Sequence, residues 1–129
     1  MAIRSARGAA ARLAGRRREV LAALWLMAKG YRILGFRLKT RAAEIDLLAQ
    51  KGGVLAVVEV KSRASIEAAL EAVGPDQRER LRRAGRSLAK NRSSLVRLSV
   101  RLDLIALAPH RLPRHIPDAW RRIDRRLTR

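Results

Sequence analysis

The chain has 129 residues and no cysteine, and its 30 Lys and Arg outnumber its 11 Asp and Glu, which gives a formal net charge of +19. This length is typical of one domain with its own core, and the missing thiols exclude disulfides and thiolate metal sites and favour a reducing cytoplasmic compartment. The charge predicts a polyanion as partner, whereas an aromatic content of 3% argues against a platform that stacks the bases of single strands.

Residues 9–29 are predicted to form a helix, although a basic segment ahead of nine apolar residues imitates a signal peptide. Glu19 at the junction and the lack of a small-x-small cleavage site after Ala28 favour a helix of the domain instead. The apolar run is also too short to span a bilayer. The stripe that we expect to be buried recurs at helical spacing and consists of Leu13, Val20, Leu24 and Met27.

Three strands are predicted next, over residues 31–39, 43–49 and 54–62, because each stretch is an apolar run rich in branched residues. Gly52 and Gly53 lie between the second and third of these strands, where a two-residue hairpin turn favours glycine. The two strands on either side of these glycines are therefore expected to pair as an antiparallel hairpin.

Four polar side chains of this hairpin share one face of the predicted sheet. A two-residue turn places Asp46 directly opposite Glu59. The same turn places Glu44 opposite Lys61, whereas a four-residue loop would place Glu44 opposite Glu59. Both loops keep the same parity, so both leave the polar groups together on one face. The opposite face, which we expect in the core, consists of Ile45, Leu47, Val58 and Val60.

Acids are unusual in strands, so the opposed Asp46 and Glu59 need a physical reason. Opposed side chains have Cβ atoms about 4.5–5.5 Å apart, and two carboxylates at such a distance repel by about 3–4 kcal/mol at an effective dielectric of about 20. A divalent cation between them reverses the sign of that interaction, and Mg²⁺ typically binds one or two carboxylates together with water and phosphate oxygens. With Lys61 positioned to hold a phosphate oxygen, the set is suited to phosphodiester hydrolysis.

The alternative is that these residues form ordinary ion pairs on a solvated sheet, with Glu44 bound to Lys61 and Glu59 bound to Arg63. Asp46 has no basic partner in that arrangement. In addition, three of the 11 acids of the chain share one predicted face. The spacing of the residues alone leaves both interpretations open.

The second half of the chain predicts two more helices. A short helix is expected over residues 65–73, and a longer one from Pro75 towards Asn91, since proline is favoured at the first helical position. The apolar face of the longer helix consists of Leu81, Ala84, Leu88 and Ala89. Its other face, called the arginine ridge below, consists of Arg78, Arg82, Arg83 and Arg86. The ridge is suited to phosphates, although a charged helical face can also be merely solvated.

A last strand is expected within residues 96–107. We place the core at residues 9–108 and a basic, proline-marked tail at 109–129, in which His110 and His115 are expected at the surface. The order α-β-β-β-α-β predicts a single α/β domain over residues 1–129, with a central mixed sheet flanked by helices.

Three sequence motifs stand out along these elements: E-I-D-L-L at 44–48, V-V-E-V-K-S-R at 57–63 and R-L-D-L-I at 101–105. With the glycine hairpin and the helices, the pattern over residues 9–120 resembles the small bacterial YraN family of uncharacterised, endonuclease-like proteins. That family is similar to the PD-(D/E)XK nuclease superfamily, in particular to its Holliday-junction-resolvase-like branch. The resemblance implies a restriction-endonuclease-like fold and metal-dependent hydrolysis of DNA, including branched or junction DNA.

The resemblance also implies roles for single residues. Asp46 and Glu59 would be metal ligands, and Lys61 would be the catalytic lysine. Glu19, on the first helix, would complete the metal shell directly or through water. The accessory candidates are Glu44 and Gln77.

We therefore expect a cytoplasmic, Mg²⁺- or Mn²⁺-dependent endonuclease that acts on DNA, with RNA as a second candidate ligand, no membrane partner and a homodimer left open. The residues expected to contact nucleic acid are Arg63, Arg78, Arg82, Arg83 and Arg86. The rival interpretation is a nucleic-acid-binding module without catalysis. A pure binder gains nothing from carboxylates at the place where phosphates dock, so Asp46 and Glu59 favour catalysis.

Overall fold

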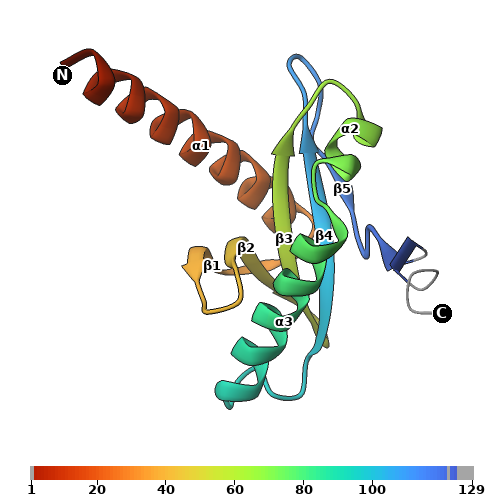
Figure 1. Cartoon of the computed structure of the whole chain (residues 1–129). Helices are drawn as coiled ribbons and strands as arrows, with labels where there is room; N and C mark the ends of the chain where they lie inside the picture. The colour runs from red at the N-terminus through yellow and green to blue at the C-terminus, as the bar shows by residue number, and fades with distance from the viewer. Residues whose placement is uncertain (1, 122, 125–129) are drawn as a thin grey trace.

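The computed structural model describes the backbone of residues 2–121, 123 and 124, and the side chains from residue 8 onward within that range. Its elements in chain order are α1 (Ala2–Ala28), β1 (Arg32–Lys39), β2 (Glu44–Lys51), β3 (Val54–Ser62), α2 (Ile66–Glu71), α3 (Pro75–Asn91), β4 (Ser99–Leu107) and β5 (Arg114–Ile116). The predicted mixed α/β architecture is confirmed: the five strands form one mixed sheet with helices against it (Figure 1).

The strands lie in the sheet in chain order, β1-β2-β3-β4-β5. Neighbours pair antiparallel except for β3 and β4, which are parallel. Parallel neighbours need a crossover connection, and here the segment containing α2 and α3 supplies it. Strand β3 is therefore central, with a hairpin partner on one side and a parallel partner on the other.

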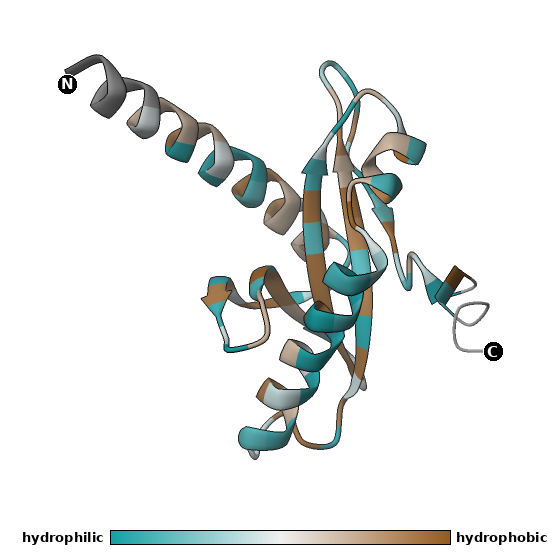
Figure 2. Cartoon of the chain, viewed as in Figure 1, coloured by the Kyte–Doolittle hydropathy of each residue, from teal (hydrophilic) through white to brown (hydrophobic). Residues whose placement is uncertain are grey.

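Each face of the sheet carries its own apolar cluster. The cluster on the α3 side includes Leu48, Val57, Leu81, Leu104 and Trp120. The cluster on the α1 side includes Leu26, Leu47, Val58 and Ile105. Because successive strand residues point to opposite faces, β3 and β4 contribute alternate residues to the two clusters. Figure 2 shows brown, apolar segments along β3 and β4, interrupted by teal segments where polar residues lie.

Helix α3 lies directly on the sheet, as its sequence predicted. Pro75 begins the helix, and Leu81, Ala84 and Ala89 are buried against the strands. The approach is closest at Gly85, where an added Cβ would lie 2.5 Å from Val57 Cγ2. Only a residue without a side chain fits between this helix and β3.

The predicted buried stripe of α1 is wrong. Its four residues are about half exposed: Leu13 by 51%, Val20 by 50%, Leu24 by 56% and Met27 by 56%. The helix instead turns Ala22, Ala23 and Leu26 towards the sheet, and its N-terminal turns extend away from the body of the molecule (Figure 1). Small alanine side chains allow the helix to approach the sheet closely. The alanine face therefore packs on the sheet, and the face with the larger apolar residues does not. Among the described residues, no helix combines the length and hydropathy needed to cross a membrane.

The segment predicted as a tail beyond residue 108 contributes to the sheet and to the core. Strand β5 pairs antiparallel with β4, and Trp120 is only 1% exposed and donates from its indole nitrogen to Leu70 O. The prediction that His115 lies at the surface is also wrong, because its side chain is 1% exposed. His110 is exposed, as predicted. A three-residue strand between prolines is too short to show any periodicity in the sequence.

Candidate functional site

The predicted two-residue turn and its register are confirmed. Strands β2 and β3 pair from Lys51 with Val54 at the turn to Leu47 with Val58. One step further, Asp46 and Glu59 would be opposed, but the ladder ends before them. Instead the Asp46 carboxylate accepts a hydrogen bond from the backbone of β3, with Val60 N 2.9 Å from Oδ2. The side chain of Asp46 is therefore fixed against β3 at the point where the two strands separate.

Strand β2 changes its packing at the same point. Ile45 was expected on the face of Leu47, but it packs in the α3-side cluster, whereas Leu47 packs in the α1-side cluster. The neighbouring strand is irregular too. Arg37, which lies in register opposite Asp46, has a positive φ of 47°. Such a conformation is unfavourable for a residue with a side chain and is often found at functional sites.

Glu59 lies in the interior next to Asp46 and is 4% exposed. Its pKa is raised from 4.5 to about 8, first because burial disfavours the charged form, and then because of hydrogen bonding to Asp46 and the negative charge of that residue. Lys61 partly offsets these effects, with Nζ 3.4 Å from Glu59 Oε2. The two carboxyl groups and the ammonium thus lie together at the end of the β2–β3 ladder; we call them the carboxylate site.

Glu19 is bound to a different partner. Both of its carboxylate oxygens accept hydrogen bonds from Arg37 Nε, at 2.9 and 2.8 Å. Within the part of the chain that the structure describes, no group of three His, Cys, Asp or Glu side chains is close enough to hold a metal ion. The structure therefore does not bring Glu19 into one cluster with Asp46 and Glu59. It connects Glu19 to Arg37, the residue whose backbone faces Asp46 across the sheet.

The accessory candidates lie apart from the carboxylate site. Glu44 is exposed and pairs in register with Lys39 of β1, not with Lys61. Gln77, in the first turn of α3, accepts a hydrogen bond from Arg80 Nη2 at 3.1 Å. Neither residue forms a hydrogen bond to Asp46 or Glu59 among the described residues.

The predicted arginine ridge is only partly a surface. Arg78 is 5% exposed, donates to Asp124 and to Val73 O, and lies over the Trp120 ring, so its expected place on an exposed ridge is wrong. Arg82 also contacts Asp124. The exposed members are Arg83 and Arg86, the second of which is paired with Glu79. Arg63, the remaining predicted contact, is exposed directly after β3.

The structure contains a second buried acid, Asp103, to which the sequence analysis assigned no role. Asp103 of β4 is fully buried and accepts hydrogen bonds from Arg101 Nε at 2.7 Å and Nη2 at 2.8 Å, and from Asp118 N at 3.0 Å. His115 Nε2 lies 2.8 Å from Asp103 Oδ2. Arg101 also donates to the Tyr31 hydroxyl. An aspartate inside the apolar run of β4, two residues after an arginine, was the signal that could have indicated this cluster, which we call the Asp103 cluster.

The donor set of the carboxylate site suits a hard divalent cation. Mg²⁺ and Mn²⁺ prefer oxygen ligands and typically bind only one or two protein carboxylates, with water and phosphate oxygens completing the shell. Asp46 and Glu59 provide two carboxyl groups, and the pKa of Glu59 is raised first by its burial and then by the adjacent Asp46, which Lys61 only partly offsets. A cation between the two groups would favour their ionised forms and so oppose both effects.

Fold and site together define a mixed α/β protein in which a buried carboxyl group, Glu59, lies beside the half-buried Asp46 and the adjacent Lys61 at the end of a glycine hairpin. The chain belongs to the uncharacterised protein family UPF0102, which matches residues 18–107. The predicted membership of a YraN-like uncharacterised family is thereby confirmed.

Relatives within the family are similar over most of their length. A UPF0102 protein of Caulobacter sp. (strain K31) is 74% identical over 117 residues, which cover 91% of this chain and 84% of the relative. A UPF0102 protein of Caulobacter vibrioides (strain NA1000 / CB15N) is 70% identical over 118 residues, which cover 92% of this chain and 94% of the relative. A UPF0102 protein of Paramagnetospirillum magneticum is 49% identical over 116 residues, which cover 87% of this chain and 90% of the relative.

Proposed function

We propose that this protein is a Mg²⁺- or Mn²⁺-dependent endonuclease of the restriction-endonuclease-like type, which hydrolyses phosphodiester bonds in DNA, including branched or junction DNA. The carboxylate site is the observation that carries the proposal. It combines two adjacent carboxyl groups, one of them with a pKa raised to about 8, with an ammonium group 3.4 Å from Glu59. Adjacent carboxyl groups disfavour each other's ionised form, and such a pair is typical of a site that binds a cation.

Each residue of the carboxylate site has a part in this chemistry. Asp46 and Glu59 would hold the cation, and the hydrogen bond from Val60 N fixes the Asp46 carboxylate in place. When bound, the cation supplies Lewis-acid stabilisation of the charge that develops on the scissile phosphate. Lys61, half-buried beside Glu59, carries a positive charge that can hold a phosphate oxygen and orient the phosphodiester.

The rival function is nucleic-acid binding without catalysis. The net charge of +19 favours contact with a polyanion under both functions. A phosphate placed beside Asp46 and Glu59 without a cation would be repelled by the negative charge of Asp46 and, wherever it is ionised, of Glu59. The carboxylate site therefore favours the enzyme, whereas exposed arginines such as Arg83 serve either function.

The test is a cleavage panel of linear, nicked, branched and single-stranded DNA with Mg²⁺ or Mn²⁺. Asp46→Ala and Lys61→Ala should each reduce cleavage by at least about 100-fold, because each removes a group that acts on the scissile phosphate. Both variants should bind DNA within a few-fold of the wild type in EDTA. Glu79→Ala removes an exposed acid on α3 and serves as the matched control, with unchanged cleavage.

The panel also decides between the two functions. If the wild-type protein cleaves none of the substrates with either metal, the endonuclease proposal is contradicted. Nucleic-acid binding without catalysis then becomes the favoured function. Cleavage that survives both Asp46→Ala and Lys61→Ala would show that the activity does not come from the carboxylate site.

A further inference from the structure

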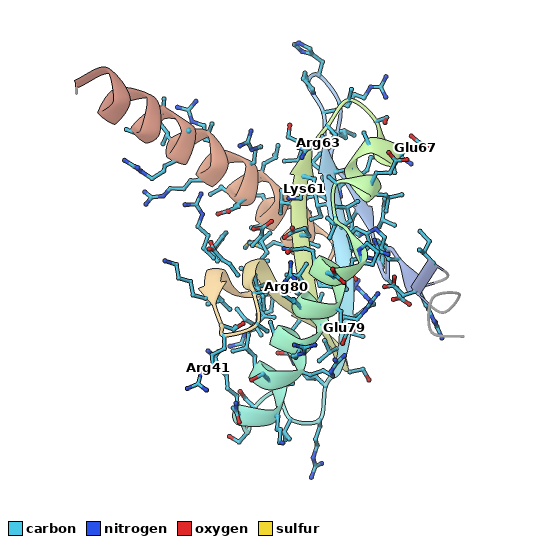
Figure 3. All side chains as sticks on the ribbon, in the orientation of Figure 1. Arg41, Lys61, Arg63, Glu67, Glu79 and Arg80 are labelled. Atoms are coloured by element: carbon cyan, nitrogen blue, oxygen red, sulfur yellow. The ribbon has the colours of Figure 1, made fainter. Side chains whose placement is uncertain are left out.

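A cavity of about 320 Å³ lies beyond the carboxylate site, where β3 and β4 end and the chain enters α2. Its lining, which we call the arginine pocket, includes Arg63, Ile66, Leu107, Arg111, Leu112 and Arg114. Figure 3 shows Arg63 beyond Lys61 at the end of β3, beside the helix α2 that carries Glu67. The pocket is separate from the groups proposed to hold the cation.

The charge of the arginine pocket is positive. Three of its lining residues are arginines and none is acidic. Among the described residues, no ion pair joins Arg63, Arg111 or Arg114 to an acid, and Arg63 Nη1 donates to a backbone oxygen, Ser62 O, at 2.7 Å. Several cations around a concave surface concentrate positive potential and attract an anion.

The rest of the lining is apolar. Ile66, Leu107 and Leu112 form part of it. Leu112 is 72% exposed, the largest value among the exposed large apolar residues of the described chain. An apolar wall beside guanidinium groups matches a ligand that combines a planar apolar part with an anion. A nucleotide has this composition, and guanidinium planes can stack on bases in a chain with few aromatic residues.

The size and position of the pocket indicate how much of a nucleic acid it can hold. A volume of about 320 Å³ lies at the small end of the range for ligand pockets, which suits one nucleotide and excludes a base-paired segment. Strand residues advance by about 3.3 Å each, so Arg63 lies roughly 13 Å along the chain from Glu59. A single DNA strand can therefore reach both the carboxylate site and the pocket.

We infer that the arginine pocket binds one unpaired nucleotide, with its base against the apolar wall and its phosphate on the arginines. This inference rests on the proposed function and specifies its substrate class: DNA that has an unpaired or extrahelical nucleotide near the scissile phosphate. A base stacked within a duplex cannot enter the pocket. Taking a base out of the stack is least costly where that base is already unpaired, so bulged or branched DNA is preferred over a continuous duplex.

The experiment measures equilibrium binding of the full chain to three DNAs in EDTA, which removes catalysis from the comparison. The DNAs are a continuous duplex, the same duplex with one bulged nucleotide, and the same duplex with an abasic residue at the bulge. The bulged duplex should bind at least about tenfold more tightly than the continuous one. The abasic bulge should lose most of this preference, because it keeps the phosphate and the flexibility but lacks the base.

Two variants and a matched control connect the preference to the pocket. Leu112→Ser and Arg111→Gln change exposed residues, so both should fold, and both should reduce the bulge preference to about threefold or less. Arg41→Gln removes the same charge from the loop between β1 and β2, away from Arg63 in Figure 3. It should lower the affinity for all three DNAs equally and leave the ratio unchanged.

The outcomes separate this inference from the proposed function. Equal affinity for the bulged and continuous duplexes, or a preference unchanged by Leu112→Ser, would overturn the pocket assignment even if Asp46-dependent cleavage is found. A bulge preference that depends on Leu112 and Arg111 supports the assignment, and it does so even if the cleavage panel is negative and the endonuclease proposal fails.

Discussion

Glu59 of β3 and Asp103 of β4 are buried acids one register step apart on neighbouring strands, and they have opposite electrostatic surroundings. Asp103 would have a raised pKa through burial, but hydrogen bonds from Arg101, His115 and the backbone of Asp118 hold its pKa below the ordinary 3.8. The pKa of Glu59 is raised to about 8 by burial and by the adjacent Asp46.

The two acids also lie on opposite faces of the sheet. Asp103 alternates with Leu102 and Leu104 of the α3-side cluster and so points to the α1 side, towards Tyr31. Glu59 alternates with Val58 and points to the α3 side. Removing a buried acid that is surrounded by donors destabilises the fold, because it leaves those donors without their acceptor. A pair of acids with too few donors instead costs stability and is expected where a cation binds. The Asp103 cluster is thus structural, and the carboxylate site is the functional candidate.

Removing Asp103 should have the largest effect on stability. Asp103→Ala leaves the Arg101 guanidinium and the buried His115 without their acceptor, so the free energy of unfolding should fall by about 3–5 kcal/mol. Asp103→Asn keeps the shape and one acceptor oxygen, and its loss should be smaller. Urea unfolding monitored by circular dichroism provides the measurement. A loss below about 1 kcal/mol for Asp103→Ala would contradict the structural role of the cluster.

In the metal-free protein, neutralising Glu59 should change the stability in the opposite direction to removing Asp103. Glu59→Gln removes the cost of burying an ionisable carboxyl group beside Asp46, so thermal stability in EDTA near neutral pH should rise or stay unchanged. Excess Mn²⁺ should stabilise the wild type, by about 2.7 kcal/mol at a free concentration 100 times the dissociation constant, and should not stabilise the variant. Melting curves of both proteins with EDTA and with Mn²⁺ make the comparison. A wild type insensitive to Mn²⁺ together with a variant of lower melting temperature would indicate an ordinary ion pair between Glu59 and Lys61.

Glu59 and Asp103 should also make opposite contributions to the pH dependence of stability. The pKa of Glu59 is higher in the folded state, so its contribution to stability is fully present below pH 4.5 and is lost as the pH rises towards 8. Each pKa unit corresponds to about 1.4 kcal/mol. Burial is the largest cause of the shift, the adjacent Asp46 adds to it, and Lys61 opposes it. The stability advantage of Glu59→Gln over the wild type should therefore grow between pH 4.5 and 8 in EDTA.

Asp103 should show the reverse dependence. Its lowered pKa gives stability that is present above pH 3.8 and is lost as the pH falls through the folded-state value. Unfolding measured from pH 3 to pH 8 for the wild type, Glu59→Gln and Asp103→Asn provides both slopes. An advantage of Glu59→Gln that is constant over this range would contradict the raised pKa of Glu59.

Local sequence signals predicted most of the sheet and the position of the carboxylate site. Gly52 and Gly53 fixed the hairpin register, and Pro75 marked the start of α3, because each of these residues constrains the backbone where it stands. Asp46, Glu59 and Lys61 are therefore recognisable as neighbours from their spacing around the hairpin turn alone.

Other features depend on contacts between distant segments and could not be predicted. The end of the β2–β3 ladder at Asp46 coincides with the positive φ of Arg37 in the adjacent strand. The Asp103 cluster needs His115, which reaches β4 through a strand of only three residues. For α1, periodicity predicted the helix but not which face packs, since the small residues Ala22 and Ala23 contact the sheet.

The contrast between buried, hydrogen-bonded charges and exposed charges also applies to the arginine ridge. The substitutions there should have the smallest effects. Arg83 is exposed on α3, whereas Arg78 is buried and bound to Asp124 and Val73 O. Affinity for DNA should fall as salt rises, with a log–log slope of about −0.9 for each phosphate contacted. Arg83→Gln should reduce the magnitude of that slope by about 0.9, the value for one phosphate contact, if the arginine binds DNA as proposed. It should leave stability unchanged, because the side chain is exposed.

Arg78→Gln should do the opposite. It should lower the free energy of unfolding by about 1–3 kcal/mol, through the loss of its buried hydrogen bonds, and leave the salt slope of the folded protein unchanged. Binding titrations between low and moderate salt, at a temperature where both variants are folded, measure the slopes. Equal slopes for the two variants would show that burial does not distinguish phosphate contacts on this helix. A wild-type affinity that does not change with salt would contradict polyanion binding altogether, since the release of counterions is a necessary consequence of arginines contacting phosphates.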